Sequence, residues 1–262
     1  MIKPYLKLIA LPLILSSIFT CTAVSSLGEE CSWYIKKQGS KSPIFPKEAE
    51  ELTGLNVYYI DKSAEESGEK VIYLTFDAGY ENGNISKTLD ILMDKKVTGA
   101  FFILDNLLYK NTDLVNRMFD EGHAVCNHTS KHRNLSECTV NEISDDLGAL
   151  ENLCLEKTGK EMSHHFRFPE GRYSKKAIES VRSLGYNTFF WSFGYDDWDN
   201  SRQPGEEYAI KKILTNTHPG EILLLHPTSD TNVKILPTLI DKWRDMGYTF
   251  GTLDSLVEKS SK

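Results

Sequence analysis

The sequence predicts an α/β fold, a distorted barrel of the (β/α)7 kind that follows an irregular N-terminal arm. Two observations support this prediction. Short apolar runs alternate with amphipathic helical patterns from Val71 onward, which is typical of parallel strands joined by helices. Polar residues also stand where several of these runs end, and barrel enzymes carry their functional residues at the carboxyl ends of their strands. The chain of 262 residues has room for one such domain.

The individual elements follow from the local pattern. The third helix begins with Thr139-Val-Asn-Glu142, a capping box in which side chains satisfy free backbone N–H groups. Ser174 is suited to cap the fourth helix, and Gly185 ends it. Strands are expected near residues 71–77, 98–104, 123–127, 164–168, 187–192, 221–226 and 248–251. Helices are expected near residues 85–95, 112–121, 140–157, 175–184, 206–217, 232–246 and 254–259.

The beginning of the chain has the pattern of an export signal. Two lysines precede an apolar stretch over residues 8–18, which is too short to span a bilayer comfortably, and small residues follow it. Residues 1–25 are therefore predicted to be a signal peptide, or a membrane anchor if they stay uncleaved. Cys21 suggests a lipoprotein as an alternative, but Thr20 is a poor residue before a lipidated cysteine. The protein is expected outside the cytoplasm, with a membrane contact only through an uncleaved leader.

Composition narrows the possible partners. The formal net charge is −7 and no basic stripe is present, which argues against nucleic acid as a partner. The cysteines beyond the leader are too few for a dense disulfide framework, and none forms a C-x-x-C pair. Cys126 is expected to be a buried, small apolar residue. Residues 26–70 are polar and are predicted to form the arm, with one short helix near residues 47–52. We expect a monomer.

Five polar motifs close predicted strands in a fixed order. A carboxylate at a strand end, followed by two imidazoles at positions i and i+4, is the skeleton of a metal-assisted hydrolase. That spacing corresponds to one helical turn, so both imidazoles could reach a single ion. The motifs are Asp77 after the apolar run 71–76, His128-Thr-Ser-Lys-His132, Arg167-Phe-Pro-Glu-Gly171, Asp197-Trp198 and Leu225-His226-Pro227.

Taken together, the motifs resemble those of the polysaccharide deacetylases, also called carbohydrate esterase family 4 or the NodB homology domain. The extension Gly79-Tyr-Glu-Asn-Gly83 resembles a subgroup, the δ-lactam-biosynthetic de-N-acetylases, which act on muramic acid in spore cortex peptidoglycan. The likeness covers roughly residues 32–258, and residues 71–258 are expected to be the catalytic domain. It implies that peptidoglycan glycan strands are the partner and that the reaction removes an N-acetyl group.

The resemblance also implies roles for the polar residues. Asp77 would be the general base that activates the attacking water. Arg167 would grip that carboxylate with two hydrogen bonds and lower its pKa. His226 would be the general acid that protonates the departing amine, and Asp197 would hold it as imidazolium.

Further roles concern the metal and the substrate. His128 and His132 would hold a divalent metal ion, expected to be zinc. The list of expected substrate contacts comprises Trp198 and Leu225 as walls of the acetyl pocket and the backbone N–H of Tyr173, or of a neighbour in its loop, as oxyanion donor. Asp196 and Asp199 flank Asp197, so that assignment could slip by one position, although adjacency to Trp198 favours Asp197.

The sequence departs from the family pattern at two positions. Ala78 stands where most members carry an aspartate that is the third metal ligand, and the lactam subgroup also lacks this aspartate. Two protein ligands should hold the ion weakly, unless Glu81 or Asn82 leans in. Glu170 stands where subgroup relatives tend to carry a positive charge. Arg172 could compensate, or Glu170 could point to solvent.

Two other functions stay open at this point. The first is deacetylation of N-acetylglucosamine in peptidoglycan or chitin, by the same chemistry. The second is an inactive glycan-binding module, which only Ala78 favours and which the intact polar motifs oppose.

Overall fold

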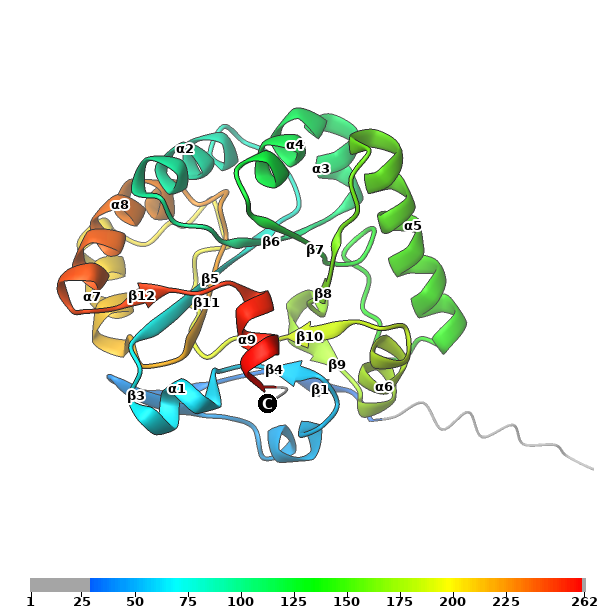
Figure 1. Ribbon diagram of the computed structural model, residues 1–262, viewed down its shortest axis with the longest axis horizontal. Helices are drawn as coiled ribbons and strands as arrows, with labels where there is room; N and C mark the ends of the chain where they lie inside the picture. Colours follow the sequence, from blue (N-terminus) through cyan, green and yellow to red (C-terminus); the bar gives the residue numbers. More distant parts are fainter. Residues whose placement is uncertain (1–28, 261–262) are drawn as a thin grey trace, which may run out of the picture.

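The computed structural model describes residues 29–260, so the predicted leader at residues 1–25 lies outside the described residues. Its centre is a curved sheet in which the strands follow the order β11-β5-β6-β7-β8-β10-β4, with β12 also paired to β5 (Figure 1). All of these pairings are parallel. The strands are β4 (Val57–Tyr58), β5 (Val71–Ala78), β6 (Ala100–Ile103), β7 (Ala124–Asn127), β8 (Ser163–Phe166), β10 (Asn187–Phe189), β11 (Glu221–Leu225) and β12 (Thr249–Phe250). The predicted distorted barrel is confirmed.

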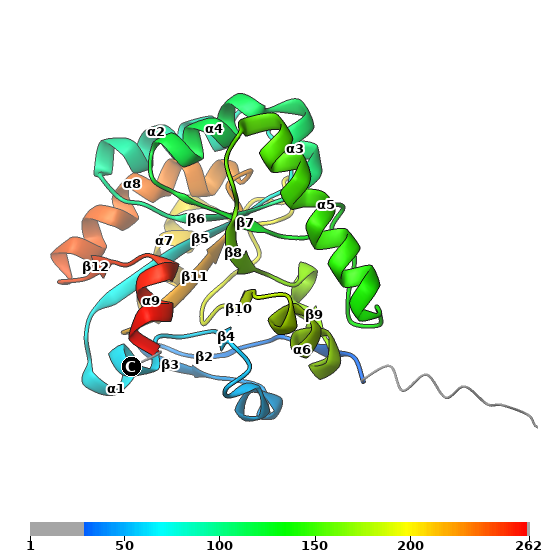
Figure 2. The ribbon, with the colours of Figure 1, turned by 45° about the vertical axis from the view of Figure 1, so that its right-hand side comes forward.

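Helices surround the outer face of this curved sheet (Figures 1 and 2). The predicted helices agree with the observed ones to within about two residues at each end, which is the usual uncertainty of helix boundaries. They are α2 (Ile85–Lys95), α4 (Thr112–Asp120), α5 (Val140–Thr158), α6 (Lys175–Ser183), α7 (Glu206–Asn216), α8 (Asp230–Asp245) and α9 (Leu253–Ser260). One short helix, α3 (Asp105–Lys110), was not predicted.

The helix caps bear out the sequence analysis. At the start of α5, the Thr139 side chain accepts the backbone N–H of Glu142, and the Glu142 carboxylate accepts the backbone N–H of Thr139. The Ser174 hydroxyl accepts the N–H of Ala177 at the start of α6. Gly185 follows that helix with a φ of +88°, a conformation that glycine adopts without steric cost. These contacts fix where α5 and α6 begin and end.

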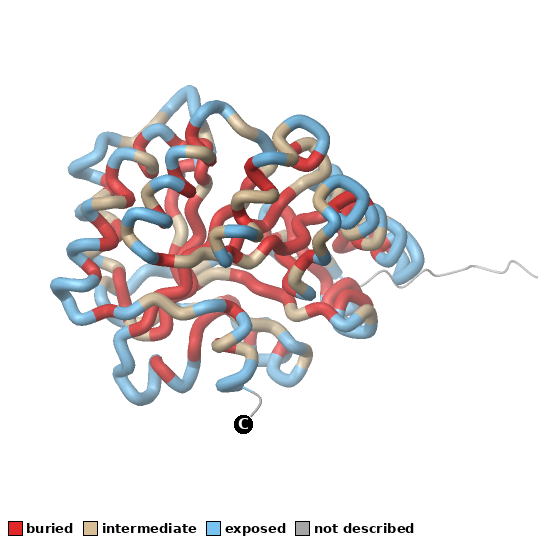
Figure 3. The backbone as a smooth tube through the Cα atoms, turned by 45° about the horizontal axis from the view of Figure 1, so that its top comes forward, coloured by how far each residue is buried: buried red, intermediate tan, exposed pale blue. Residues whose placement is uncertain are grey.

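The core lies between the sheet and the helices around it. The strands are buried while the outward faces of the helices are exposed (Figure 3). Phe76 of β5 stacks on Phe101 of β6 with ring centroids 4.8 Å apart. Cys126 is fully buried as expected, and the four cysteines of the described residues are free thiols. Among residues 29–260, no helix is long and apolar enough to cross a membrane.

The segment expected to be an irregular arm contains regular elements. They are β1 (Cys31–Ser32), β2 (Lys36–Gln38), β3 (Lys41–Ile44), the 3-10 helix η1 (Lys47–Leu52), β4 and α1 (Lys62–Ser67). Strands β2 and β3 form a hairpin, β1 pairs with β9 (Arg172–Tyr173), and β4 joins the main sheet beside β10. The expected helix at residues 47–52 is present as η1. These strands have two to four residues each, which is too short for an alternating pattern to identify them.

Trp33 packs this N-terminal segment against the barrel. Its ring stacks on Phe190 with centroids 4.5 Å apart, and its indole N–H donates to the carbonyl oxygen of Trp191 at 2.9 Å. The side chain is buried, and aromatic burial of this kind is a large stabilising contribution. The segment is therefore held at the side of the sheet where β8 and β10 end.

Candidate active site

The carboxyl ends of four strands of the main sheet carry the predicted polar residues. Asp77 is the penultimate residue of β5, and His128 directly follows β7. Arg167 directly follows β8, and His226 directly follows β11. Because these strands are parallel, their ends meet at the same edge of the sheet, and the structure brings the four side chains together there.

Arg167 is the buried centre of this group. Its Nη1 donates to Asp77 Oδ1 at 2.8 Å, while Nη2 donates to Thr75 Oγ1 at 2.9 Å and Nε donates to the Phe189 carbonyl at 3.1 Å. The guanidinium also lies 4.2 Å from the centre of the Phe102 ring. The sequence analysis expected two hydrogen bonds from Arg167 to Asp77, but the structure has one. The second Nη group is used by Thr75 instead.

The surroundings of Asp77 favour its ionised form. Burial alone would raise the pKa of this carboxyl, but the positive charge of Arg167 and the nearby rings of His128 and His226 outweigh that effect. The pKa of Asp77 therefore lies below its ordinary value of 3.8. A carboxylate that stays ionised at neutral pH can accept a proton from a water molecule, as a general base must.

The two histidines are brought together by a loop. His128 and His132 have ring centroids 5.1 Å apart, and their planes are inclined by 74°. The prediction that one helical turn separates them is wrong, because no helix is present at these residues. Instead Thr129 and His132 have positive φ values of 68° and 57°, which fold the loop back on itself. The Asn127 side chain supports this loop by accepting the N–H of Thr129 at 2.9 Å.

Hydrogen bonding fixes which nitrogen of His128 is available. Nδ1 lies 2.9 Å from the carbonyl oxygen of Arg167, which can only accept, so Nδ1 carries the proton. Nε2 then has a free lone pair and lies 3.5 Å from Asp77 Oδ2. Burial lowers the pKa of His128 to about 4, although the charge of Asp77 opposes this shift. A neutral, oriented imidazole of this kind fits a metal ligand.

His226 is held by the buried carboxylate of Asp197. Its Nδ1 lies 2.8 Å from Asp197 Oδ1, and its backbone N–H donates to Asp197 Oδ2 at 2.8 Å. Asn232 Nδ2 donates to the same Oδ2 at 2.6 Å, and the Tyr195 hydroxyl donates to Asn232 Oδ1. Asp197 is fully buried, whereas the Asp196 side chain is 87% exposed. Asp197 is thus the partner of the histidine. Asn232 and Tyr195 belong to none of the five sequence motifs, and only their contacts in the structure show their part in this network.

The Asp197 carboxylate raises the pKa of His226. Burial lowers the pKa of the imidazole, but the charge and hydrogen bond of Asp197, with the charge of Asp77, outweigh it. The net result is a pKa above the ordinary value of 6.5. This shift favours the protonated form of His226, which is the form that a general acid requires.

A cleft of about 630 Å³ opens beside these groups. Asp77, His132 and His226 line it, and the indole of Trp198, which is 60% exposed, forms part of its wall. The expectation for Leu225 is wrong. Leu225 is buried in the main hydrophobic core, and Leu224 lines the cleft instead, because neighbouring strand residues face opposite sides.

Tyr173 does not reach this cleft with its side chain. It is buried, and its residue pairs with Cys31 of strand β1. Glu170, from the same loop, does line the cleft, and its φ of 57° turns the backbone sharply there. An oxyanion donor from this loop therefore stays a prediction.

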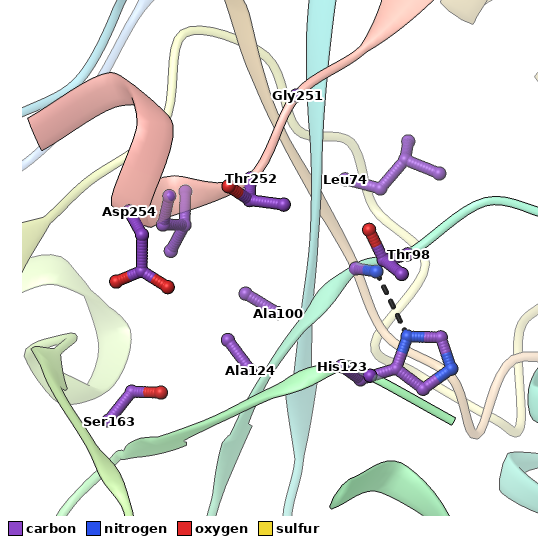
Figure 4. Close-up of a pocket in the computed structure, with 12 residues that line it drawn as sticks. Leu74, Thr98, Ala100, His123, Ala124, Ser163, Gly251, Thr252 and Asp254 are labelled. Atoms are coloured by element: carbon purple, nitrogen blue, oxygen red, sulfur yellow. Dashed lines mark hydrogen bonds between the residues drawn. The ribbon is translucent and has the colours of Figure 1, made fainter. Parts of the chain in front are cut away.

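A second, smaller hollow of about 140 Å³ lies at the opposite ends of the strands (Figure 4). It is lined by the first residues of β6, β7 and β8 and contains none of the predicted catalytic residues. His123 borders it and accepts the backbone N–H of Gly99 through Nδ1 at 3.1 Å (Figure 4). This contact holds His123 against the backbone that leads into β6.

The sequence of this chain is similar to those of known proteins. A family model described as polysaccharide deacetylase matches residues 64–189. The peptidoglycan-N-acetylmuramic acid deacetylase PdaA of Bacillus subtilis is 36% identical over 229 residues, which cover 87% of this chain and 86% of that protein. The chain belongs to the polysaccharide deacetylase family. The deacetylase also resembles the peptidoglycan-N-acetylglucosamine deacetylase of Bacillus cereus, at 30% identity over 73% of this chain and 90% of that protein.

The similarity extends to the fold of the deacetylase. The structure of Bacillus subtilis PdaA, a family 4 carbohydrate esterase, superimposes with a TM-score of 0.83 at 34% identity. It covers 88% of this chain and 98% of that chain. A family 4 carbohydrate esterase from Bacillus anthracis follows with a TM-score of 0.71 at 31% identity, covering 88% and 97%.

The residues that could complete a metal shell in this deacetylase are engaged elsewhere. Ala78 is fully buried and belongs to the main core. Glu81 Oε2 accepts the backbone N–H of Ile85 at 2.8 Å at the start of α2, and Asn82 donates to the Thr228 carbonyl at 2.8 Å. Glu81 and Asn82 are therefore used in these contacts, and neither supplies a third ligand beside the histidines in this arrangement. Within residues 29–260, no group of three or more potential ligands is arranged to hold a metal ion.

Replacing Asp197 by Asn should move the pH profile of the deacetylase. If His226 is the general acid, activity is present below the pKa of His226 and is lost as the pH rises through it. Asp197→Asn removes the charge that raises this pKa, so the alkaline limb of kcat/KM should shift to lower pH. The measurement is acetate release against pH, with Asp199→Asn as the matched control. An unchanged alkaline limb would remove His226 from the acid role.

Proposed function

We propose that the protein is an exported N-deacetylase that removes the acetyl group from muramic acid residues of peptidoglycan, in the formation of the muramic δ-lactam of spore cortex. The observation that carries this proposal is a pair of complementary groups that line the same cleft. Arg167 favours the ionised form of Asp77, and Asp197 favours the protonated form of His226. A general base and a general acid in one cleft are what amide hydrolysis requires.

The chain's own residues account for the proton movements. Asp77 accepts a proton from the attacking water as the water oxygen forms a bond to the acetamide carbon. His226 gives a proton to the amine nitrogen as the carbon–nitrogen bond breaks, so that acetate and a free amine leave. The buried Asp197 and Asn232 keep the imidazole in the orientation that this transfer needs. Trp198 and Leu224 offer apolar surface to the acetyl methyl.

His128 and His132 are the residues that would hold a divalent ion, and we propose zinc. Such an ion, when bound, polarises the acetamide carbonyl and lowers the pKa of the attacking water. The fit rests on the orientation of His128, whose Nδ1 is occupied by the Arg167 carbonyl and whose Nε2 is free. Burial keeps this imidazole neutral, because it lowers the pKa of His128 to about 4.

The metal should be held weakly, because only two protein ligands face it. We expect zinc affinity to be lower than in a three-ligand site by about 10- to 100-fold, the scale known for disturbing a site's supporting groups. Brief treatment with a chelator should therefore abolish activity, and added zinc should restore it. Titration calorimetry gives the affinity directly. Binding at nanomolar Kd would contradict this expectation, since it would require a third protein ligand.

The variant Ala78→Asp also tests how tightly the metal is held. Ala78→Asp should tighten zinc binding if the new carboxylate turns toward the histidines. Ala78 is fully buried in the core, however, so a carboxylate that failed to reach the ion would be buried without a partner. Tighter binding together with a retained Tm identifies the ligand position, whereas a lowered Tm with unchanged affinity shows that this side chain faces the core.

Muramic acid is proposed over N-acetylglucosamine on two grounds. The more similar relative is named for the muramic acid reaction, and the extension Gly79-Tyr-Glu-Asn-Gly83 resembles the lactam subgroup. Formation of the lactam uses the lactyl carboxylate, so this carboxylate should be free of its stem peptide in the substrate.

The test compares three substrates with purified protein. They are glycan strands stripped of stem peptides, strands that bear peptides, and N-acetylglucosamine oligomers. Mass spectrometry of the digested products should show loss of acetyl from muramic acid in the stripped strands first. Faster reaction with the glucosamine oligomers would replace the proposed substrate, and binding without acetate release from any of them would indicate a glycan-binding module.

A further inference from the structure

Two lysines line the catalytic cleft. Lys37 comes from strand β2 of the N-terminal segment, and Lys212 comes from helix α7. They share the cleft with Asp77, His226 and the indole of Trp198. Neither lysine belongs to a motif that the sequence analysis identified, because their elements are far apart in the chain.

The charge of Lys37 is not neutralised by the protein. Its Nζ lies 5.0 Å from the centre of the Phe193 ring, and among the described residues no carboxylate comes within 4.0 Å of it. Burial lowers the pKa of Lys37, and the positive charge of Lys212 lowers it further, although Asp196 opposes this. The two ammonium groups are therefore close enough to repel each other.

Lys212 is only weakly paired. Its Nζ lies 4.0 Å from Asp196 Oδ2, and the Asp196 side chain is 87% exposed, so water screens this contact and it contributes little. The Tyr208 hydroxyl accepts a hydrogen bond from the same Nζ at 3.0 Å. The protein thus places two cations in one cleft, where an anionic group of a substrate can join them.

Glu170 adds a negative charge to the wall of the cleft. It lines the same space, with its side chain 62% exposed, so a negative group on the substrate is repelled from its side and attracted toward the lysines. Arg172 offsets this charge only in part. Both its Nη2 and its Nε donate to Glu30, at 2.8 and 3.1 Å, while its Nη1 stays 3.8 Å from Glu170.

We infer that Lys37 and Lys212 recognise a carboxylate of the substrate, and that this carboxylate is the lactyl group of peptide-free muramic acid. The inference rests on the proposed function. Muramic acid differs from glucosamine by this lactyl ether, so two cations in the cleft distinguish the sugars by charge. An amide bond to a stem peptide removes the charge that the lysines attract, which explains why the peptide should be absent.

The test uses the full chain and two single variants, Lys37→Met and Lys212→Met, which keep the length of the side chain and remove its charge. Lys36→Met and Lys211→Met are the matched controls, since these exposed lysines are sequence neighbours that do not line the cleft. Each protein is assayed on peptide-free muramic glycan, on the same glycan with its lactyl carboxylates converted to amides, and on N-acetylglucosamine oligomers.

Each cleft variant should raise KM for peptide-free muramic glycan by about 10-fold or more, the scale of a lost hydrogen bond to a charged group. The preference of the native chain for the carboxylate over the amide form should shrink in the same proportion, and the control variants should keep it. A loss that is equal on all three substrates, or an unchanged preference, overturns the inference. If the native chain does not act on muramic glycan at all, the proposed function itself has failed.

Discussion

Asp77→Asn is expected to abolish turnover while the protein stays folded. The amide keeps the shape of the side chain and an oxygen that can accept from Arg167, but it cannot accept a proton from water. Loss of a general base typically lowers the rate by about 10²- to 10⁴-fold. Acetate release measures the loss, and circular dichroism checks the fold.

The matched control is Asp90→Asn. Asp90 is an exposed carboxylate of helix α2 that pairs with Arg117, so the same chemical change occurs far from the cleft. Its activity should equal that of the native chain. An Asp77→Asn protein that works within a few fold of the native rate would remove Asp77 from the base role.

Arg167→Met should damage both stability and catalysis. The side chain is fully buried, and its loss leaves the Asp77 carboxylate desolvated without its partner. Removing one member of a buried ion pair typically costs about 3–5 kcal/mol of the free energy of unfolding. Urea unfolding, followed by tryptophan fluorescence, measures this change.

The catalytic part of this prediction concerns pH. In the native protein the pKa of Asp77 is lowered. The ionised Asp77 carboxylate therefore stabilises the folded state above the unfolded-state pKa, and this stabilisation is lost as the pH falls through the folded-state pKa. Without Arg167, burial is the dominant influence and raises this pKa, so the acid limb of kcat/KM should move to higher pH. Arg167→Lys keeps a charge and should move the limb less. Identical acid limbs in all three proteins would show that Arg167 does not tune the base.

The sequence was sufficient for the parts of this protein that have strong local signals. The long apolar run of β5 and the capping box of α5 were identified because each is encoded by a few adjacent residues. The catalytic residues were identified because they follow strands, and the parallel order of the strands then brings them together. Their roles came from resemblance to a family and not from spacing.

The features that were missed depend on tertiary contacts. Strand β4 is two residues long and is a strand only because β10 lies beside it. Leu224 and Leu225 look alike in sequence, and only the direction in which β11 faces decides which one lines the cleft. Asn232 is on a helix, and its role arises from the carboxylate of Asp197 that it contacts.

The pairing of β4 with β10 has a consequence for the behaviour of the whole protein. The backbone N–H groups of Thr188 and Phe190 donate to the carbonyls of Asn56 and Tyr58, both at 2.8 Å, so the N-terminal segment closes an edge of the sheet. An open strand edge is a template for pairing with other chains and leads to aggregation. The same segment that protects this edge also carries Lys37 into the cleft. If Lys37 recognises the substrate as inferred above, solubility and substrate choice both depend on the packing of this segment, and a chain that lacked the residues before β5 is expected to lose both.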